Sequence, residues 1–96
     1  MPVKVIIPTA LRPYAGKQES VELQAATVQE ALSSLTSQFA ELKKHLFADD
    51  GRLRSFVNVY VNDEDIRYLQ KDQTRVREGD IISIVPSIAG GTRNKI

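Results

Sequence analysis

Cysteine is absent from this 96-residue chain, and so are long hydrophobic runs and an excess of charge of one sign. Without cysteine there are no disulfides, no thiolate metal ligands and no thiol nucleophile, so the core must hold the fold alone. The 13 Lys and Arg residues nearly balance the 12 Asp and Glu residues, which leaves a formal charge of +1. The broad cationic field that nucleic acid demands is missing, and we expect no nucleic-acid partner.

The first apolar segment, residues 2–7, is too short and too strand-like for an export leader or a membrane span. We therefore expect a soluble, cytoplasmic protein with no membrane partner. A chain of this length with 42% hydrophobic residues fits one compact domain. We expect that domain over residues 1–86, followed by a flexible tail over residues 87–96.

Period-two alternation predicts two strands near the start of the chain. Val3, Val5 and Ile7 alternate with their neighbours, and residues 20–24 alternate again. Residues 12–17 between them contain a proline and a glycine, which are typical of a loop. The two strands are therefore predicted to form a hairpin.

A helix is predicted to begin after Thr27, because Thr27 and Glu30 match a capping box, in which each side chain satisfies a free backbone N–H. Apolar residues then follow at helical spacing: Val28, Ala31, Leu32, Leu35, Phe39, Leu42, Leu46 and Phe47. We assign this stripe to the core. The helix is predicted to continue to Asp49–Gly51, where glycine supplies a stop.

The second half of the chain predicts three more strands. Residues 56–61 are rich in β-branched and aromatic side chains, which favours a central strand. Asn and Asp residues at 62–65 predict a turn, and residues 66–68 a short return strand. After a turn at 77–80, residues 81–85 are apolar at four of five positions, which predicts a strand in the middle of the sheet with apolar surroundings on both faces. The order is that of an α+β fold, with a mixed sheet of four to five strands packed on one main helix.

Four residues of the last two long strands are expected on the sheet face away from the helix: Phe56, Tyr60, Ser83 and Val85. An uncovered apolar sheet face is a credible contact surface for a partner protein.

Three features together resemble the ubiquitin-like sulfur carriers that serve molybdopterin, thiamine and cysteine synthesis: the element order, the Gly79–Asp80 turn before the last strand, and Gly90–Gly91 near the chain end. The resemblance implies a β-grasp fold and covers almost the whole domain. Residues 7–9, 11–13, 56–65 and 89–91 are most similar to the carriers that are dedicated to cysteine synthesis in actinobacteria.

The resemblance implies a carrier that is a substrate of other enzymes, with no cofactor of its own and no catalytic residue. An E1-like activating enzyme would use ATP to adenylate the carboxylate of Gly91, which is then converted to a thiocarboxylate. In the cysteine pathway the thiocarboxylate sulfur attacks an activated serine derivative on a cysteine-synthase-like pyridoxal phosphate enzyme. A zinc metalloprotease later frees the product.

The C-terminal glycines suit this chemistry, because a chain without Cβ atoms can thread a narrow enzyme cleft. Ile88, Ala89 and Gly90 are expected to be recognised together with Gly91. Gly91 is internal, however, and the amide that it shares with Thr92 must be cleaved to give a free acid. We therefore expect a metalloprotease of the deubiquitinase-like class to remove residues 92–96.

Alternatives stay open at this point. Residues 92–96 could be left over from cloning, or the carrier could have lost its role. The chain could also be a ubiquitin-like modifier that is attached to lysines, or the small subunit of a molybdopterin-synthase-like complex.

Other polar residues favour structural roles. Asp63–Asp65 lacks the spaced ligands and the glycine of a calcium loop and is interpreted as a turn, so no metal site is expected. His45 is interpreted as a solvated residue on a helix surface. Four arginines could pair with an acidic partner surface, although ordinary solvation is the default: Arg12, Arg52, Arg54 and Arg67.

Overall fold

The computed structural model describes residues 2–55 and 57–86. In chain order the elements are β1 (Pro2–Ile6), the 3₁₀ helix η1 (Thr9–Ala15), β2 (Ser20–Gln24), α1 (Val28–Gln38), α2 (Ala40–Leu46), β3 (Val57–Val61), β4 (Glu64–Asp65), the 3₁₀ helices η2 (Ile66–Tyr68) and η3 (Lys71–Gln73), and β5 (Ile81–Pro86).

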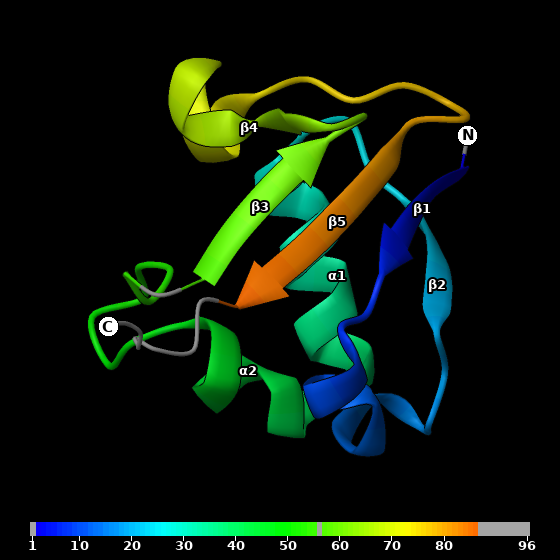
Figure 1. Ribbon diagram of the computed structural model, residues 1–96, viewed down its shortest axis with the longest axis vertical. Coiled ribbons are helices and arrows are strands. Elements are labelled where there is room, and N and C mark those ends of the chain that lie inside the picture. The colour runs from blue at the N-terminus through cyan, green and yellow to red at the C-terminus, as the bar shows by residue number, and fades with distance from the viewer. Residues whose placement is uncertain (1, 56, 87–96) are drawn as a thin grey trace, which may run out of the picture.

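The five strands form one mixed sheet in the order β2-β1-β5-β3-β4 (Figure 1). β1 and β5 are parallel, whereas the pairs β1–β2, β3–β5 and β3–β4 are antiparallel. The predicted hairpin and the central place of residues 81–85 are both confirmed. β3 was expected in the centre as well, but it lies one strand from the edge, and its outer neighbour β4 is only two residues long.

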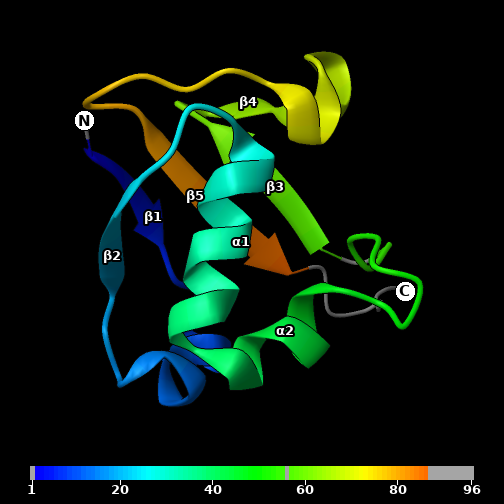
Figure 2. The same ribbon diagram turned by 180° about the vertical axis from the view of Figure 1, so that it is seen from behind.

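The core lies between the sheet and the two α-helices, which cover one face only (Figure 2). Val28, Ala31, Leu32 and Leu35 are buried on α1, so the predicted core stripe is confirmed there. The predicted N-cap is confirmed too, because the Glu30 N–H donates to Thr27 Oγ1 at 3.2 Å. The Glu30 carboxylate reaches one residue further back than a capping box requires and accepts from the Ala26 N–H.

The predicted single helix from residue 28 to Gly51 is wrong. Phe39, with φ −127° and ψ 83°, interrupts it, and α2 leaves in a new direction (Figure 2). The new direction lets α2 contact η1, and Leu42 and Leu46 become fully buried. Gly51 does not cap a helix. It has φ +85° in the turn of a small hairpin that pairs Phe47 with Leu53.

Two shorter segments also differ from expectation. The predicted loop at 12–17 is mostly the 3₁₀ helix η1, which ends at Gly16 with a left-handed φ of 64°. The predicted return strand at 66–68 is wrong, because the return strand is β4 at Glu64–Asp65 and residues 66–68 form the 3₁₀ helix η2. Asn62 and Asp63 both have positive φ, 50° and 74°, which makes a two-residue hairpin turn and starts the return at Glu64.

β5 was expected to meet apolar surroundings on both faces, and this is wrong for one of them. Ile82 and Ile84 are buried under the helices, but Ile81 and Val85 are 40% and 43% exposed. The helices cover only one face of the sheet, so the outward side chains of β5 stay open to solvent.

Candidate functional site

β5 is the strand that leads toward the predicted tail, and its first residue is fixed by Asn62. The Ile81 N–H donates to Asn62 Oδ1 at 3.0 Å, and the Asn62 N–H donates to the Ile81 carbonyl at 2.9 Å. Asn62 Nδ2 also donates to Asp80 Oδ1 at 3.0 Å. This bond, followed by one from the Arg77 backbone N–H, lowers the pKa of the Asp80 carboxyl. The strand therefore starts from a fixed register.

At its other end, β5 pairs Pro86 with Val57 of β3. The predicted site residues Ile88, Ala89, Gly90, Gly91 and Thr92 lie outside the described residues, and so does Phe56. The flexible tail, its processing at the Gly91–Thr92 bond and the domain boundary after residue 86 stay predictions.

The sheet face opposite the helices carries the described members of the predicted partner surface. Tyr60 lies opposite Ser83, and Val85 lies opposite Asn58, so Tyr60, Ser83 and Val85 share the outward side. Their predicted placement is right, and their role in partner contact stays a prediction.

Sequence reasoning missed Ile6 and Ile81 on this face. Ile6 pairs with Ser83 across the parallel ladder, and Ile81 pairs with Lys4. Alternation with the buried Val5 already pointed Ile6 outward, but the parallel pairing of the first and last strands was needed to place it beside Ser83. We call this surface the open sheet face and define it by Ile6, Tyr60, Ile81, Ser83 and Val85.

The open sheet face suits binding rather than acid–base chemistry. Its members are aliphatic apart from a tyrosine and a serine, and Lys4 and Glu22 at its side lie opposite each other in the register of β1 and β2. Apolar side chains on a sheet are already ordered by the strands, so a partner can bury them with little further loss of entropy.

The acidic segment Asp63–Asp65 is a turn only at Asp63, because Glu64 and Asp65 form β4. The Asp65 side chain is 8% exposed, and its Oδ2 lies 2.7 Å from an Arg67 guanidinium nitrogen. The Arg67 side chain, then its backbone N–H, lowers the pKa of Asp65. Across residues 2–55 and 57–86, no three His, Asp or Glu side chains are grouped so as to hold a metal ion. No helix among these residues has the length and apolar character needed to cross a membrane.

His45 is not the freely solvated residue that was expected. Its ring stacks on Tyr14 with 4.2 Å between the centroids and 27° between the planes. Its Nε2 is buried and has no hydrogen-bond partner within the described structure. The turn of α2 toward η1 explains the difference, because it brings Tyr14 over the imidazole.

Comparison with known proteins agrees with this architecture. The ThiS family model matches residues 5–91. The sulfur carrier protein CysO of Mycobacterium tuberculosis is 40% identical over 93 residues, which cover 95% of this chain and all of the relative. Ubiquitin-related modifier 1 of Schizosaccharomyces pombe is 30% identical over 97 residues, again 95% of this chain and all of the relative.

A chain of the Amycolatopsis orientalis BexX/CysO complex superposes with a TM-score of 0.84 at 43% identity, covering 93% of this chain and 99% of that one. The fold is thus the ubiquitin-like β-grasp that the sequence predicted. This chain belongs to the ThiS family of ubiquitin-like sulfur carriers.

Proposed function

We propose that this chain is a protein-bound sulfur donor for cysteine biosynthesis and that its partners supply all the catalysis. The observation that carries the proposal is the 40% identity to the sulfur carrier CysO over that relative's full length. The resemblance of residues 7–9, 11–13, 56–65 and 89–91 to carriers of this kind points the same way.

The working atom is the carboxylate carbon of Gly91 once residues 92–96 have been removed. The family model ends at this residue, which supports the assignment of the last five residues to a removable extension. A metalloprotease would hydrolyse the Gly91–Thr92 amide and leave a free acid.

Activation needs a leaving group, because a carboxylate at neutral pH is a weak electrophile. A Gly91 carboxylate oxygen attacks the α-phosphorus of ATP on the E1-like enzyme, and pyrophosphate leaves. A sulfide or persulfide sulfur then attacks the carbonyl carbon of the acyl adenylate, and AMP leaves. When the donor is a persulfide, a thiol must then break its S–S bond to release the thiocarboxylate.

We infer that the activating enzyme binds the open sheet face, because few residues separate this face from Gly91 along the chain. Val85 is six residues before Gly91, so an extended chain lets the terminal carboxylate reach about 20 Å from that side chain. An enzyme that contacts Ile81 and Val85 can therefore receive the chain end in a cleft nearby.

Sulfur transfer from the thiocarboxylate on a cysteine-synthase-like pyridoxal phosphate enzyme tests whether the chain serves cysteine synthesis. The thiocarboxylate form of the chain is incubated with that enzyme and an activated serine derivative, and the carrier is weighed by intact mass spectrometry. We expect a carrier that is heavier than its free-acid form by one cysteine residue, whose sulfur comes from the thiocarboxylate, and a zinc metalloprotease then removes that residue. A thiocarboxylate that persists unchanged would argue against cysteine synthesis.

A second candidate is protein modification, which the similarity to ubiquitin-related modifier 1 favours. In that case the Gly91 carbonyl forms an amide with lysine side chains of other proteins. Tryptic peptides from host cells would then carry residues 78–91 on lysine, because Arg77 is the last trypsin site before Gly91, and these branches would vanish when the gene is deleted. The molybdopterin-synthase subunit stays an unsupported alternative.

A further inference from the structure

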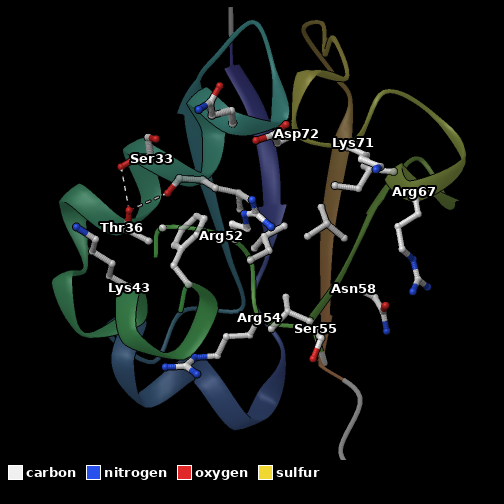
Figure 3. Close-up of a pocket in the computed structure, with 18 of the residues that line it drawn as sticks. Ser33, Thr36, Lys43, Arg52, Arg54, Ser55, Asn58, Arg67, Lys71 and Asp72 are labelled. Carbon is white, nitrogen blue, oxygen red and sulfur yellow. Dashed lines mark hydrogen bonds between the residues drawn. The ribbon is translucent and has the colours of Figure 1, made fainter. Parts of the chain in front are cut away.

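A groove of about 770 Å³ lies between the helices and the outer edge of β3 (Figure 3). It contains none of the residues that define the open sheet face, and the proposed sulfur chemistry does not use it. Its apolar lining comes from α1, the segment after α2, β3 and η2: Leu32, Phe47, Leu53, Val57, Val59 and Ile66.

The outer backbone edge of β3 faces this groove. β4 pairs only with Tyr60 and Val61, so no described strand covers the outer side of residues 57–59. In a two-residue hairpin the residues that flank the turn exchange both hydrogen bonds, which directs the Val61 backbone toward β4. By alternation, the N–H and C=O groups of Val57 and Val59 point away from β5 as well.

One of these groups has a local partner that agrees with this geometry. The Val57 N–H donates to the Arg54 carbonyl at 2.9 Å, on the outer side of the strand. The Val59 N–H and C=O are left facing the groove. Unpaired edge groups of this kind are the template to which an extended peptide can add as a further strand.

The groove is also strongly cationic. Five cationic side chains line it against two carboxylates, those of Asp65 and Asp72. The cations lie on both sides, with Lys43 and Arg52 toward α2 and Arg67 and Lys71 toward β4 (Figure 3).

The two carboxylates offset only part of this charge, and Asp50, outside the lining, lies 4.0 Å from Arg52. Asp65 is engaged by Arg67. Within residues 2–55 and 57–86, neither Lys43 nor Lys71 has a salt-bridge partner. The excess positive charge favours an acidic occupant.

We propose that this groove binds an extended, acidic segment of a partner protein by strand addition to β3. The segment's backbone pairs with Val59, alternate apolar side chains enter the lining at Leu53 and Ile66, and flanking carboxylates meet Lys43 and Lys71. This second interface leaves the open sheet face free, so a carrier can be held by one partner while another enzyme acts on its C-terminus. The chain's own residues 92–96 carry Arg93 and Lys95, and their charge makes them poor occupants.

The test uses the full chain labelled with ¹⁵N and a terminally blocked octapeptide in which valine alternates with glutamate. Titration is expected to shift the amide resonances of residues 57–59 and of Leu53, with the open sheet face unchanged. A control octapeptide with lysine in place of glutamate should leave all these resonances in place. The double variant Lys43→Glu with Lys71→Glu should weaken the binding of the acidic peptide about tenfold or more. Lys17→Glu, an exposed charge change in the loop after η1, should leave it unchanged.

Three results would overturn the proposal. The first is equal binding of the two octapeptides, and the second is unaltered affinity in the double variant with its spectrum otherwise native. The third is a difference in the groove resonances between the full chain and a chain ending at Gly91 in the absence of peptide, because the C-terminal residues would then occupy the groove themselves.

Discussion

At the scale of single residues, Asn62 joins the turn after β3 to the start of β5. It combines a backbone conformation that L-residues rarely adopt with two side-chain hydrogen bonds, to the Ile81 N–H and to Asp80. Asparagine tolerates positive φ better than most residues and can bond to nearby backbone groups, which explains its use here.

Replacing this side chain should destabilise the fold in two separable ways. Asn62→Gly removes the side-chain bonds but keeps an easy positive φ, and should cost about 1–2 kcal/mol. Asn62→Ala adds the steric penalty of a Cβ atom in the left-handed region, for a further loss of about 1 kcal/mol. Urea denaturation of both variants measures the difference, and equal stability of the two would contradict a conformational role for Asn62.

The lowered pKa of Asp80 predicts how the stability of the fold depends on pH. Its folded-state pKa is lowered by Asn62 and Arg77, so the unfolded chain binds the proton more readily than the folded one. The stabilisation by this carboxylate is therefore fully present above pH of about 4, the ordinary range of aspartate, and is lost as the pH falls through the lowered pKa.

The measurement is a series of thermal melts between neutral and strongly acidic pH. Asp80→Asn should lose less stability on acidification than the parent chain, since one of its titrating carboxyls is gone. Asp65, whose pKa Arg67 lowers, responds in the same direction and leaves a residual slope. Identical slopes for parent and variant would show that Asp80 gives no such support.

A substitution at Val85 tests whether the activating enzyme contacts the open sheet face. Val85→Asp places a charge on an exposed position, so the fold should be retained while sulfur loading by the activating enzyme falls about tenfold or more, as expected for a charge buried against an apolar partner. Tyr68→Asp is the matched control, because Tyr68 is 85% exposed and lies outside this face. Equal sulfur loading of the two variants would show that the activating enzyme does not contact the open sheet face.

At the scale of elements, apolar spacing along the chain was sufficient to predict the buried side chains wherever an element packs on the core with one face. Val3, Val5 and Ile7, and the stripe on α1, are buried as their spacing predicts. The break at Phe39 was not predictable in this way, because no glycine or proline marks it and the apolar spacing continues to Leu46. Contact of α2 with η1 stabilises the changed helix direction, and spacing along the chain does not reveal that contact.

A substitution at Leu32 tests whether α1 packs in the core. It is 1% exposed, so Leu32→Ala should destabilise the fold by about 2–5 kcal/mol through lost burial and a residual cavity. Leu69→Ala removes the same atoms from a side chain that is 37% exposed and should cost about 1 kcal/mol or less. Chemical denaturation separates the two, and similar losses would contradict the core assignment.

At the scale of the whole molecule, sequence indicated the fold class and the central place of β5, whereas the role that the family resemblance implies for Gly90 and Gly91 stays a prediction. Sequence did not indicate the groove beside β3. That groove arises because β4 stops at Asp65 and because residues from α2, η2 and η3 meet there, which spacing along the chain cannot reveal. The open sheet face was half predicted, through Tyr60, Ser83 and Val85, and the contribution of β1 required the parallel pairing with β5.

The central claim is that Gly91, once terminal, carries sulfur. A chain ending at Gly91 is incubated with its activating enzyme, ATP and sulfide, and its intact mass is compared with that of the full chain treated alike. We predict a gain of about 16 Da, one oxygen replaced by sulfur, in the shortened chain and no gain in the full chain. An unchanged mass for the shortened chain, while ATP is still consumed with a known carrier as control, would contradict the account.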